Sequence, residues 1–144
     1  MDTLRNDHIV LTADVEGKPV RVMVDSGASA SYASPRVRQQ LKDRVRTKVK
    51  PYPLNMADGS PTDYGGGWIR EELHGIRLRI GHHEERINLD IVSIKYDILL
   101  GMDWLRRHNP VIDWKARTLK FPDCSRENRT GDRSPPTVPF VKAI

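Results

Sequence analysis

The chain has one cysteine, few aromatic residues and no long apolar run among its 144 residues. Because Cys124 is the only cysteine, an intrachain disulfide is excluded, and a reducing, intracellular compartment is expected. No apolar run approaches the roughly 20 residues that span a bilayer, so no membrane partner is expected. The first residues lack the apolar segment of a signal peptide, and the length fits one domain of ordinary size.

Positive charge is concentrated in one stretch of the chain. The net charge is +5, and residues 36–50 hold seven Lys or Arg side chains against one acidic residue, Asp43. This stretch is either a patch that faces RNA or an acidic partner, or a solvated helix face and loop. Base stacking requires aromatic side chains, and this stretch has none before Tyr52. Nucleic acid is therefore not expected as a direct ligand.

Residues that could bind a metal ion are few and scattered. Zinc sites usually combine His and Cys residues at short, regular spacings. The spacing in this chain fits no such pattern, and His82 and His83 fall together in a predicted turn. We therefore expect neither a metal site nor a cofactor. The candidate ligands are His74, His82, His83, His108 and Cys124.

Alternation of apolar and polar residues predicts an all-β domain over residues 1–122. One clear case is Ile76, Leu78 and Ile80, which are separated by arginines. A turn at residues 16–19 and another around Asp58-Gly59 indicate hairpins. Strands are predicted over residues 8–15, 19–24, 48–56, 76–80, 87–91, 96–101, 111–114 and 117–121.

One or two short helices interrupt the predicted strands. Ser34-Pro35 has the pattern of an N-cap followed by proline, and a helix is predicted from there to about Asp43. A second helix is predicted over residues 102–108. Trp104 and Trp114 are expected in the core. Residues 123–144 are polar and contain several prolines, so they predict a tail or linker.

The most informative motif is Asp25-Ser26-Gly27, which follows the apolar run 20–24 and leads into small residues. A carboxylate at the end of a buried strand is costly unless it is paired or hydrogen-bonded. Ser26 can form a local hydrogen bond, and Gly27 permits a close approach of the backbone. The tripeptide fits an ordinary surface turn as well as the loop of a catalytic aspartate, and the segments that follow decide between them.

Two further motifs follow Asp25-Ser26-Gly27 in order. Ala57-Asp58-Gly59-Ser60 forms the tip of a predicted hairpin, and Ile98-Leu99-Leu100-Gly101 runs into the second predicted helix. Over residues 8–121 this order resembles the retropepsins, the aspartic proteases of retroviruses and long-terminal-repeat retrotransposons. The stretch Leu-Leu-Gly-Met-Asp-Trp-Leu is similar to gypsy-type elements, in particular to fungal gypsy polyproteins.

This resemblance implies the acid-protease fold of a single pepsin-like lobe. It assigns Asp25 as the catalytic aspartate and the Ser26 hydroxyl as a link between two active-site loops. Retroviral enzymes often carry Asp where this chain has Ser29, so the contacts with substrate differ at that position. By the same resemblance, the loop is supported by Ser26, Gly27, Ala28, Leu100 and Gly101, and the substrate or flap contacts come from Ser29, Ala57, Asp58, Gly59 and Ser60.

One active-site loop per chain implies a homodimer. Hydrolysis by this route needs two carboxylates that face one water and share a proton, because both cannot easily ionise at close range. The chain supplies one Asp-Ser-Gly, so a C2 dimer with Asp25 of each subunit near the axis is expected. The predicted interface strands lie around residues 1–7 and 111–121.

Three functions are compatible with these motifs. The first is an aspartic endopeptidase that processes a retroelement polyprotein and binds an extended peptide under its flaps. The second is a non-catalytic module of the same fold that serves dimerisation or peptide binding. The third is a host-domesticated protease with a cellular substrate. The intact Asp25-Ser26-Gly27 favours an enzyme, and its expected location is the cytoplasm, including retroelement particles.

Overall fold

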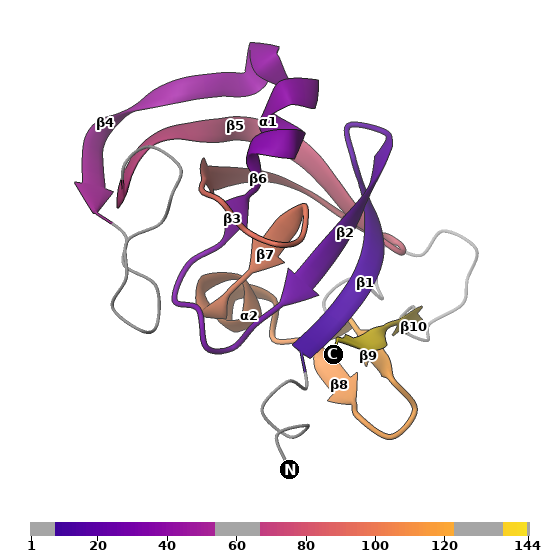
Figure 1. The fold of residues 1–144 in the computed structure, drawn as a ribbon. Helices are drawn as coiled ribbons and strands as arrows, with labels where there is room; N and C mark the ends of the chain where they lie inside the picture. Colours follow the sequence, from indigo (N-terminus) through magenta and orange to yellow (C-terminus); the bar gives the residue numbers. More distant parts are fainter. Residues whose placement is uncertain (1–7, 54–66, 123–136, 144) are drawn as a thin grey trace.

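The computed structural model describes residues 8–53, 67–122 and 137–143 (Figure 1). In these ranges the chain is mostly β, with helices α1 (Pro35–Gln40) and α2 (Met102–His108) and a 3-10 helix, η2 (Lys42–Arg44). The prediction of an all-β domain with one or two short helices is confirmed. The strands are β1 (His8–Val15), β2 (Lys18–Val24), β3 (Tyr32–Ala33), β4 (Val45–Pro53), β5 (Trp68–Ile80), β6 (His83–Ile91), β7 (Ile98–Leu100), β8 (Val111–Asp113), β9 (Thr118–Lys120), β10 (Thr137–Pro139) and β11 (Val141–Ala143).

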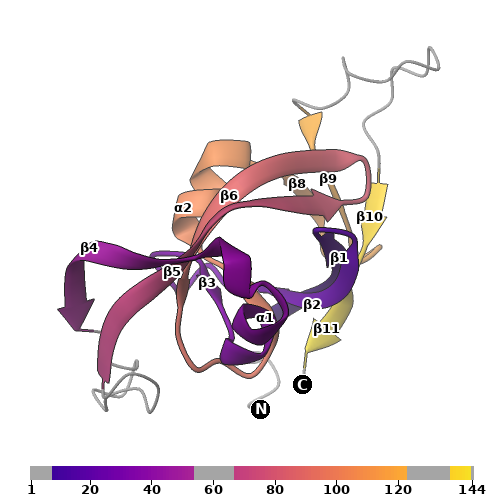
Figure 2. The same cartoon turned by 90° about the horizontal axis from the view of Figure 1, so that it is seen from above.

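Eight of the described strands form one curled sheet. Their order is β11-β1-β2-β7-β3-β6-β5-β4, and β1 also pairs with β5, which closes part of the sheet on itself. Figure 2 shows β1, β2, β5 and β6 curving around a common interior, where alternate side chains of these strands form the core. A second sheet consists of β10, β9 and β8.

The first hairpin and the longest strand follow directly from their sequences. Glu16 and Gly17 have positive φ angles of 50° and 83°, which suit the tight turn between β1 and β2. In β5, Ile76, Leu78 and Ile80 are buried and the arginines between them are exposed. The alternation seen in the sequence therefore orients these side chains as predicted.

Helix α1 begins where the sequence predicts and ends before the predicted residue. The Val37 N–H donates to the Oγ of the N-cap residue Ser34 at 3.4 Å, and Pro35 follows as the first helical residue. The helix was predicted to reach about Asp43, but Leu41 leaves the helical conformation and the chain continues as η2. No helix among the described residues is long and apolar enough to cross a membrane.

The end of the chain is part of the fold. Residues 123–144 were predicted as a tail, whereas the structure places residues 137–143 in β10 and β11, which pair with β9 and β1. Val138 and Phe140 are buried, at 5% and 6% exposure, because alternate residues of this short segment face the core. Residues 123–136 lie outside the described part of the chain.

The tryptophans differ in their environments. Trp104, on α2, is buried as predicted, at 2% exposure. The prediction that Trp114 lies in the core is wrong, because 59% of this residue is exposed in the turn between β8 and β9. Its ring makes an edge contact with Phe140, with ring centroids 6.1 Å apart. Trp114 therefore covers the end of the core rather than filling it.

Phe140→Ala is expected to lower the free energy of unfolding by about 3–5 kcal/mol, because the change deletes a buried aromatic ring. The matched control is Val141→Ala, next to it on β11, where the side chain is 54% exposed and the expected change is within about 0.5 kcal/mol. Urea unfolding of both variants measures the difference. Equal and small effects would contradict the packing of the chain end against the core.

Candidate active site

Asp25 lies where β2 ends, and a parallel neighbour fixes its backbone. β2 pairs with β7 in parallel, with Val24 opposite Leu100. The Asp25 N–H donates to the Leu100 carbonyl oxygen at 2.9 Å. On its other edge, β7 pairs antiparallel with β3, where Tyr32 lies opposite Leu99. One strand thus holds both the start and the end of the loop that contains Asp25.

The carboxylate of Asp25 is oriented by its own loop. The Gly27 N–H donates to Asp25 Oδ1 at 2.8 Å, and the Ala28 N–H donates to the Asp25 carbonyl oxygen at 3.2 Å. A Cβ at Gly27 would lie 3.1 Å from Asp25 Oδ1, so a side chain there would press on the carboxylate. Asp25 is half-buried, while Ser26 and Ser29 are exposed. The loop therefore presents a positioned carboxylate at the surface of the chain.

Gly101 lies directly against this loop. A Cβ on Gly101 would lie 2.2 Å from the Ala30 carbonyl oxygen and 2.6 Å from that of Ala28. Real Cβ atoms do not approach backbone oxygens so closely, so only glycine fits. The next residue then ties the loop to α2, since the Met102 N–H donates to the Ala28 carbonyl oxygen at 2.7 Å. Leu100 and Gly101 therefore both contact the loop that contains Asp25.

Ser31 and Asp103 add a polar link that sequence reasoning missed. Ser31 is 6% exposed, and its Oγ accepts a hydrogen bond from the Gly101 N–H at 3.0 Å. The same hydroxyl donates to Asp103 Oδ1 at 2.7 Å. The Asp103 N–H in turn donates to the Ser29 carbonyl oxygen at 3.3 Å. In the sequence Ser31 is one of several small residues after Gly27, and only its burial beside the second motif distinguishes it.

An apolar cluster adjoins the loop. Leu99 directly precedes Leu100, whose carbonyl oxygen accepts the Asp25 N–H, and Ala28 belongs to the loop itself. The four buried members of the cluster come from β3, β5, β7 and the segment just after β6. Its buried members are Tyr32, Ile69, Val92 and Leu99, and Met23, Ala28, Ala30, Tyr52 and Ile94 pack against them.

Hydrogen bonds join the end of β4, which carries Tyr52 of this cluster, to β6. The Tyr52 hydroxyl, on β4, donates to an Asp90 carboxylate oxygen, and Lys48 Nζ donates to Asp90 Oδ1 at 2.8 Å. Burial, together with the hydrogen bond to Asp90, raises the pKa of Tyr52 well above its usual value. Tyr52 therefore stays a neutral donor, and the end of β4 is tied to the sheet just before the predicted flap.

Some residues that the sequence analysis singled out lie in other elements than predicted, and others lie outside the described residues. His83 was predicted in a turn, but it begins β6 and is 6% exposed, whereas its neighbour His82 is exposed. His83 approaches His108, which is 25 positions away in the sequence, with ring centroids 4.6 Å apart. The predicted flap residues Ala57, Asp58, Gly59 and Ser60, and also Cys124, lie outside the described residues, so their roles stay predictions.

Comparison with known sequences places the chain in a family of protease domains. The family model described as the PEG10/RTL1 protease domain matches residues 21–129. DNA damage-inducible protein 1 from Candida glabrata is 28% identical over 113 residues, which are 78% of this chain and 25% of that protein. The chain therefore spans about a quarter of the length of the curated relatives that it matches. These relatives do not single out gypsy-type elements, so the resemblance is confirmed at the level of a retropepsin-like protease domain.

Comparison with solved structures confirms the predicted fold. The retroviral protease-like domain of Ddi1 from Leishmania major superposes with a TM-score of 0.65 at 19% identity, covering 93% of this chain and 94% of that one. A retropepsin-like aspartic protease from Rickettsia conorii gives a TM-score of 0.53 at 22% identity, covering 76% and 79%. At these identities the likeness shows a retropepsin-like fold, and it does not show an activity.

Gly101→Ala is expected to destabilise the chain by about 1–3 kcal/mol or more, because the new methyl group would collide with two backbone carbonyl oxygens, of which that of Ala28 is held by the Met102 N–H. Gly17→Asn is the matched control: nothing lies within 4 Å of a Cβ at Gly17, and asparagine tolerates its positive φ. Thermal or urea unfolding measures both. A stability of Gly101→Ala equal to that of Gly17→Asn would contradict the close approach.

Proposed function

The chain belongs to the PEG10/RTL1 protease-domain family, and from that premise we propose that it is an aspartic endopeptidase in which Asp25 activates a water molecule. The observation that carries the proposal is the position of the Asp25 carboxylate. It is half-buried at the end of β2 and accepts a hydrogen bond from the Gly27 N–H at 2.8 Å. A carboxylate held in this way keeps its orientation while it exchanges a proton.

The chemistry requires a second carboxylate on the opposite side of the water. Two carboxylates at close range share one proton over a working pH range, and the titration belongs to the pair. The ionised member takes a proton from the water, whose oxygen attacks the carbon of the scissile carbonyl group. The protonated member polarises the carbonyl oxygen. When the C–N bond breaks, a carboxylic acid of the pair donates a proton to the leaving nitrogen, so the pair again holds one proton.

A second copy of this chain supplies that carboxylate in our proposal. The sequence contains one Asp-Ser-Gly, so a C2 dimer brings Asp25 of each protomer to the axis. Dimerisation is then a condition for activity. We propose interface strands around residues 1–7, which lie outside the described residues, and around residues 111–121. The exposed side chains of Val111 and Trp114, at 56% and 59%, are available for such a contact.

The substrate in this proposal is an extended peptide of several residues. Its backbone would lie beside the active-site loop, where Ser29 is exposed. The flap that the sequence predicts at residues 57–60, outside the described residues, would cover it. The similarity of the stretch around Gly101 to gypsy-type elements supports a retroelement polyprotein as substrate. Cytoplasmic particles of such an element are the corresponding location.

The curated relatives favour a second candidate substrate. Proteins named DNA damage-inducible protein 1 match 78% of this chain, and the matched part is a quarter of their length. A protease domain of this kind within a longer cellular protein would cleave a cellular substrate rather than a polyprotein. The chemistry proposed for Asp25 is the same in both cases, so the two candidates differ in substrate alone.

Asp25→Asn is expected to abolish cleavage of a peptide library at pH 4–7 while the chain stays folded. The asparagine side-chain oxygen still accepts the Gly27 hydrogen bond, but the amide cannot act as a base. Asp43→Asn, at an exposed position, is the matched control and should cleave as the wild type does. Pepstatin should inhibit both active proteins. Cleavage that persists in pure Asp25→Asn protein would rule out the role of Asp25.

Activity per chain is expected to fall on dilution, because a monomer holds half of the required pair of carboxylates. Specific activity measured over a dilution series, with sedimentation of the same samples, tests this. Specific activity that stays constant where sedimentation shows only monomers would contradict the dimer. Absence of cleavage by a sample that is dimeric would instead favour a peptide-binding module of the same fold.

A further inference from the structure

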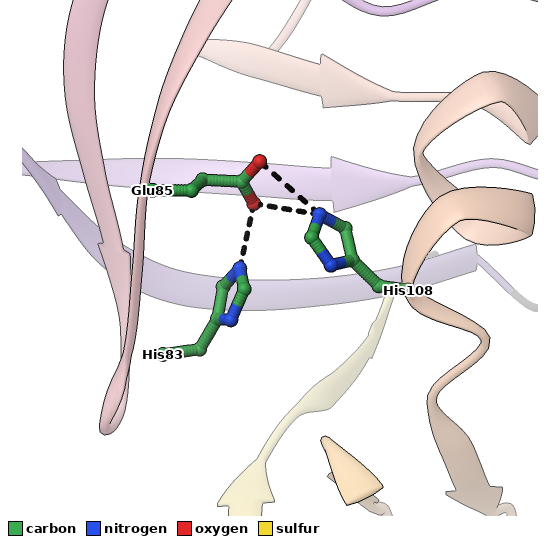
Figure 3. Close-up of side chains that lie close together, drawn as sticks. All are labelled: His83, Glu85 and His108. Atoms are coloured by element: carbon green, nitrogen blue, oxygen red, sulfur yellow. Dashed lines mark hydrogen bonds and ion pairs between the residues drawn. The ribbon is translucent and has the colours of Figure 1, made fainter. Parts of the chain in front are cut away.

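Three polar side chains that the proposed hydrolysis does not use meet between β6 and the end of α2 (Figure 3). His83 and Glu85 project from the same face of β6, two residues apart, and His108 is the last residue of α2. The Nε2 atom of His83 lies 2.7 Å from Glu85 Oε2. The Nε2 atom of His108 lies 3.0 Å from Oε2 and 3.1 Å from Oε1 of the same carboxylate. One possible ligand atom from each residue thus lies within 4.8 Å of the others.

The cluster is enclosed by aromatic rings. The side chains of His83, Glu85 and His108 are 7%, 11% and 16% exposed. The ring of Phe121 stacks on His83 with ring centroids 4.4 Å apart. The indole Nε1–H of Trp104 donates to Glu85 Oε2 at 2.9 Å and fixes the orientation of the carboxylate. A hydrogen bond of this kind to a ligating carboxylate is typical of the surroundings of protein metal sites.

The carboxylate in this pocket is surrounded by nitrogen atoms. Glu85 is 11% exposed, and side-chain nitrogens of His83, His108 and Trp104 lie 2.7–3.1 Å from its oxygens. A buried anion is costly unless a positive partner compensates it. Protonated imidazole is one such partner, and a bound cation is another.

We propose that His83, Glu85 and His108 form a binding site for a divalent cation of the zinc class. Two imidazole nitrogens and one carboxylate oxygen are a ligand set that zinc adopts in proteins, with water in the fourth position. Imidazole ligands disfavour Mg²⁺ and Ca²⁺, which prefer oxygen. The site is independent of the proposed proteolysis, and nothing in it requires Asp25 to be active.

The geometry is close to what a tetrahedral ion requires. Zinc–ligand bonds of about 2.0–2.2 Å place neighbouring ligand atoms roughly 3.3–3.5 Å apart. The nitrogen–oxygen separations of 2.7–3.1 Å would therefore open by about 0.2–0.8 Å, a shift within reach of side-chain rotation. Each Nε2 must then be free of its proton, which moves to Nδ1 of the same ring or, from a charged ring, to solvent.

The consequence of binding is structural. An ion here joins β6 to the end of α2, and the start of α2 holds the active-site loop through the Met102–Ala28 hydrogen bond of 2.7 Å. The helix has seven residues, so its two ends are only about 10 Å apart. A cation at His108 would thereby stiffen the element that supports the loop, without taking part in hydrolysis.

Zinc titration of the full chain tests the proposal. The protein is first dialysed against a chelator, and Cys124→Ser is the background, because a free thiol also binds zinc. Calorimetry should give one Zn²⁺ per chain. Both His108→Gln and Glu85→Gln should weaken binding at least tenfold, since loss even of an outer hydrogen bond at a metal site costs 10–100-fold. His82→Gln, at the exposed neighbour of His83, should bind as the background protein does.

A second measurement separates a built site from surface binding. Co²⁺ should replace Zn²⁺ and give the visible absorption of a tetrahedral site in the background protein and in His82→Gln, but not in His108→Gln. Circular dichroism checks that each variant is folded. If His108→Gln does not fold, the isosteric Glu85→Gln takes its place in the cobalt measurement. Absence of binding by the folded background protein, or equal weakening by His82→Gln and Glu85→Gln, would overturn the site and leave a hydrogen-bonded cluster only.

Discussion

The parallel pairing of β2 with β7 is the contact on which the region around Asp25 depends. β7 is only three residues long, yet it pairs with β2 on one edge and with β3 on the other. The loop from Asp25 to Ser31 connects those two outer strands and therefore has to pass the end of β7. Gly101 occupies that point, where any side chain would collide with loop carbonyl oxygens. The position of the Asp25 carboxylate thus follows from a backbone contact.

Helix α2 couples this contact to the rest of the core. Its first residues donate to the carbonyl oxygens of the Asp25 loop. In its middle, Trp104 is buried in the main core and also reaches the Glu85 carboxylate. Its last residue, His108, belongs to the polar cluster with His83. The seven residues of α2 therefore connect the Asp25 loop, the core and the Glu85 carboxylate. Because the helix is short and closely packed, a displacement of one end also displaces the other.

The basic residues between positions 36 and 50 are largely paired with acidic residues in the folded chain. Four of the seven basic side chains form ion pairs with acidic residues from other segments, at nitrogen–oxygen distances of 2.8–3.7 Å. These acidic side chains compensate much of the positive charge of the stretch. This favours a solvated helix face and loop over a surface for RNA. The pairs are Arg36–Asp97, Arg38–Glu71, Arg44–Glu16 and Lys48–Asp90.

The sequence by itself determined what local patterns can determine. Alternation placed the side chains of β5, the Ser34-Pro35 pair set the start of α1, and ordered short motifs identified the Asp25 loop and Gly101. Only the tertiary structure decided which distant residues meet. The hydrogen bonds of Ser31, the burial of Phe140 and the approach of His83 to His108 arise from contacts between segments that are distant in the sequence. Contacts between such distant segments depend on the order of strands in the sheets, which local periodicity does not encode.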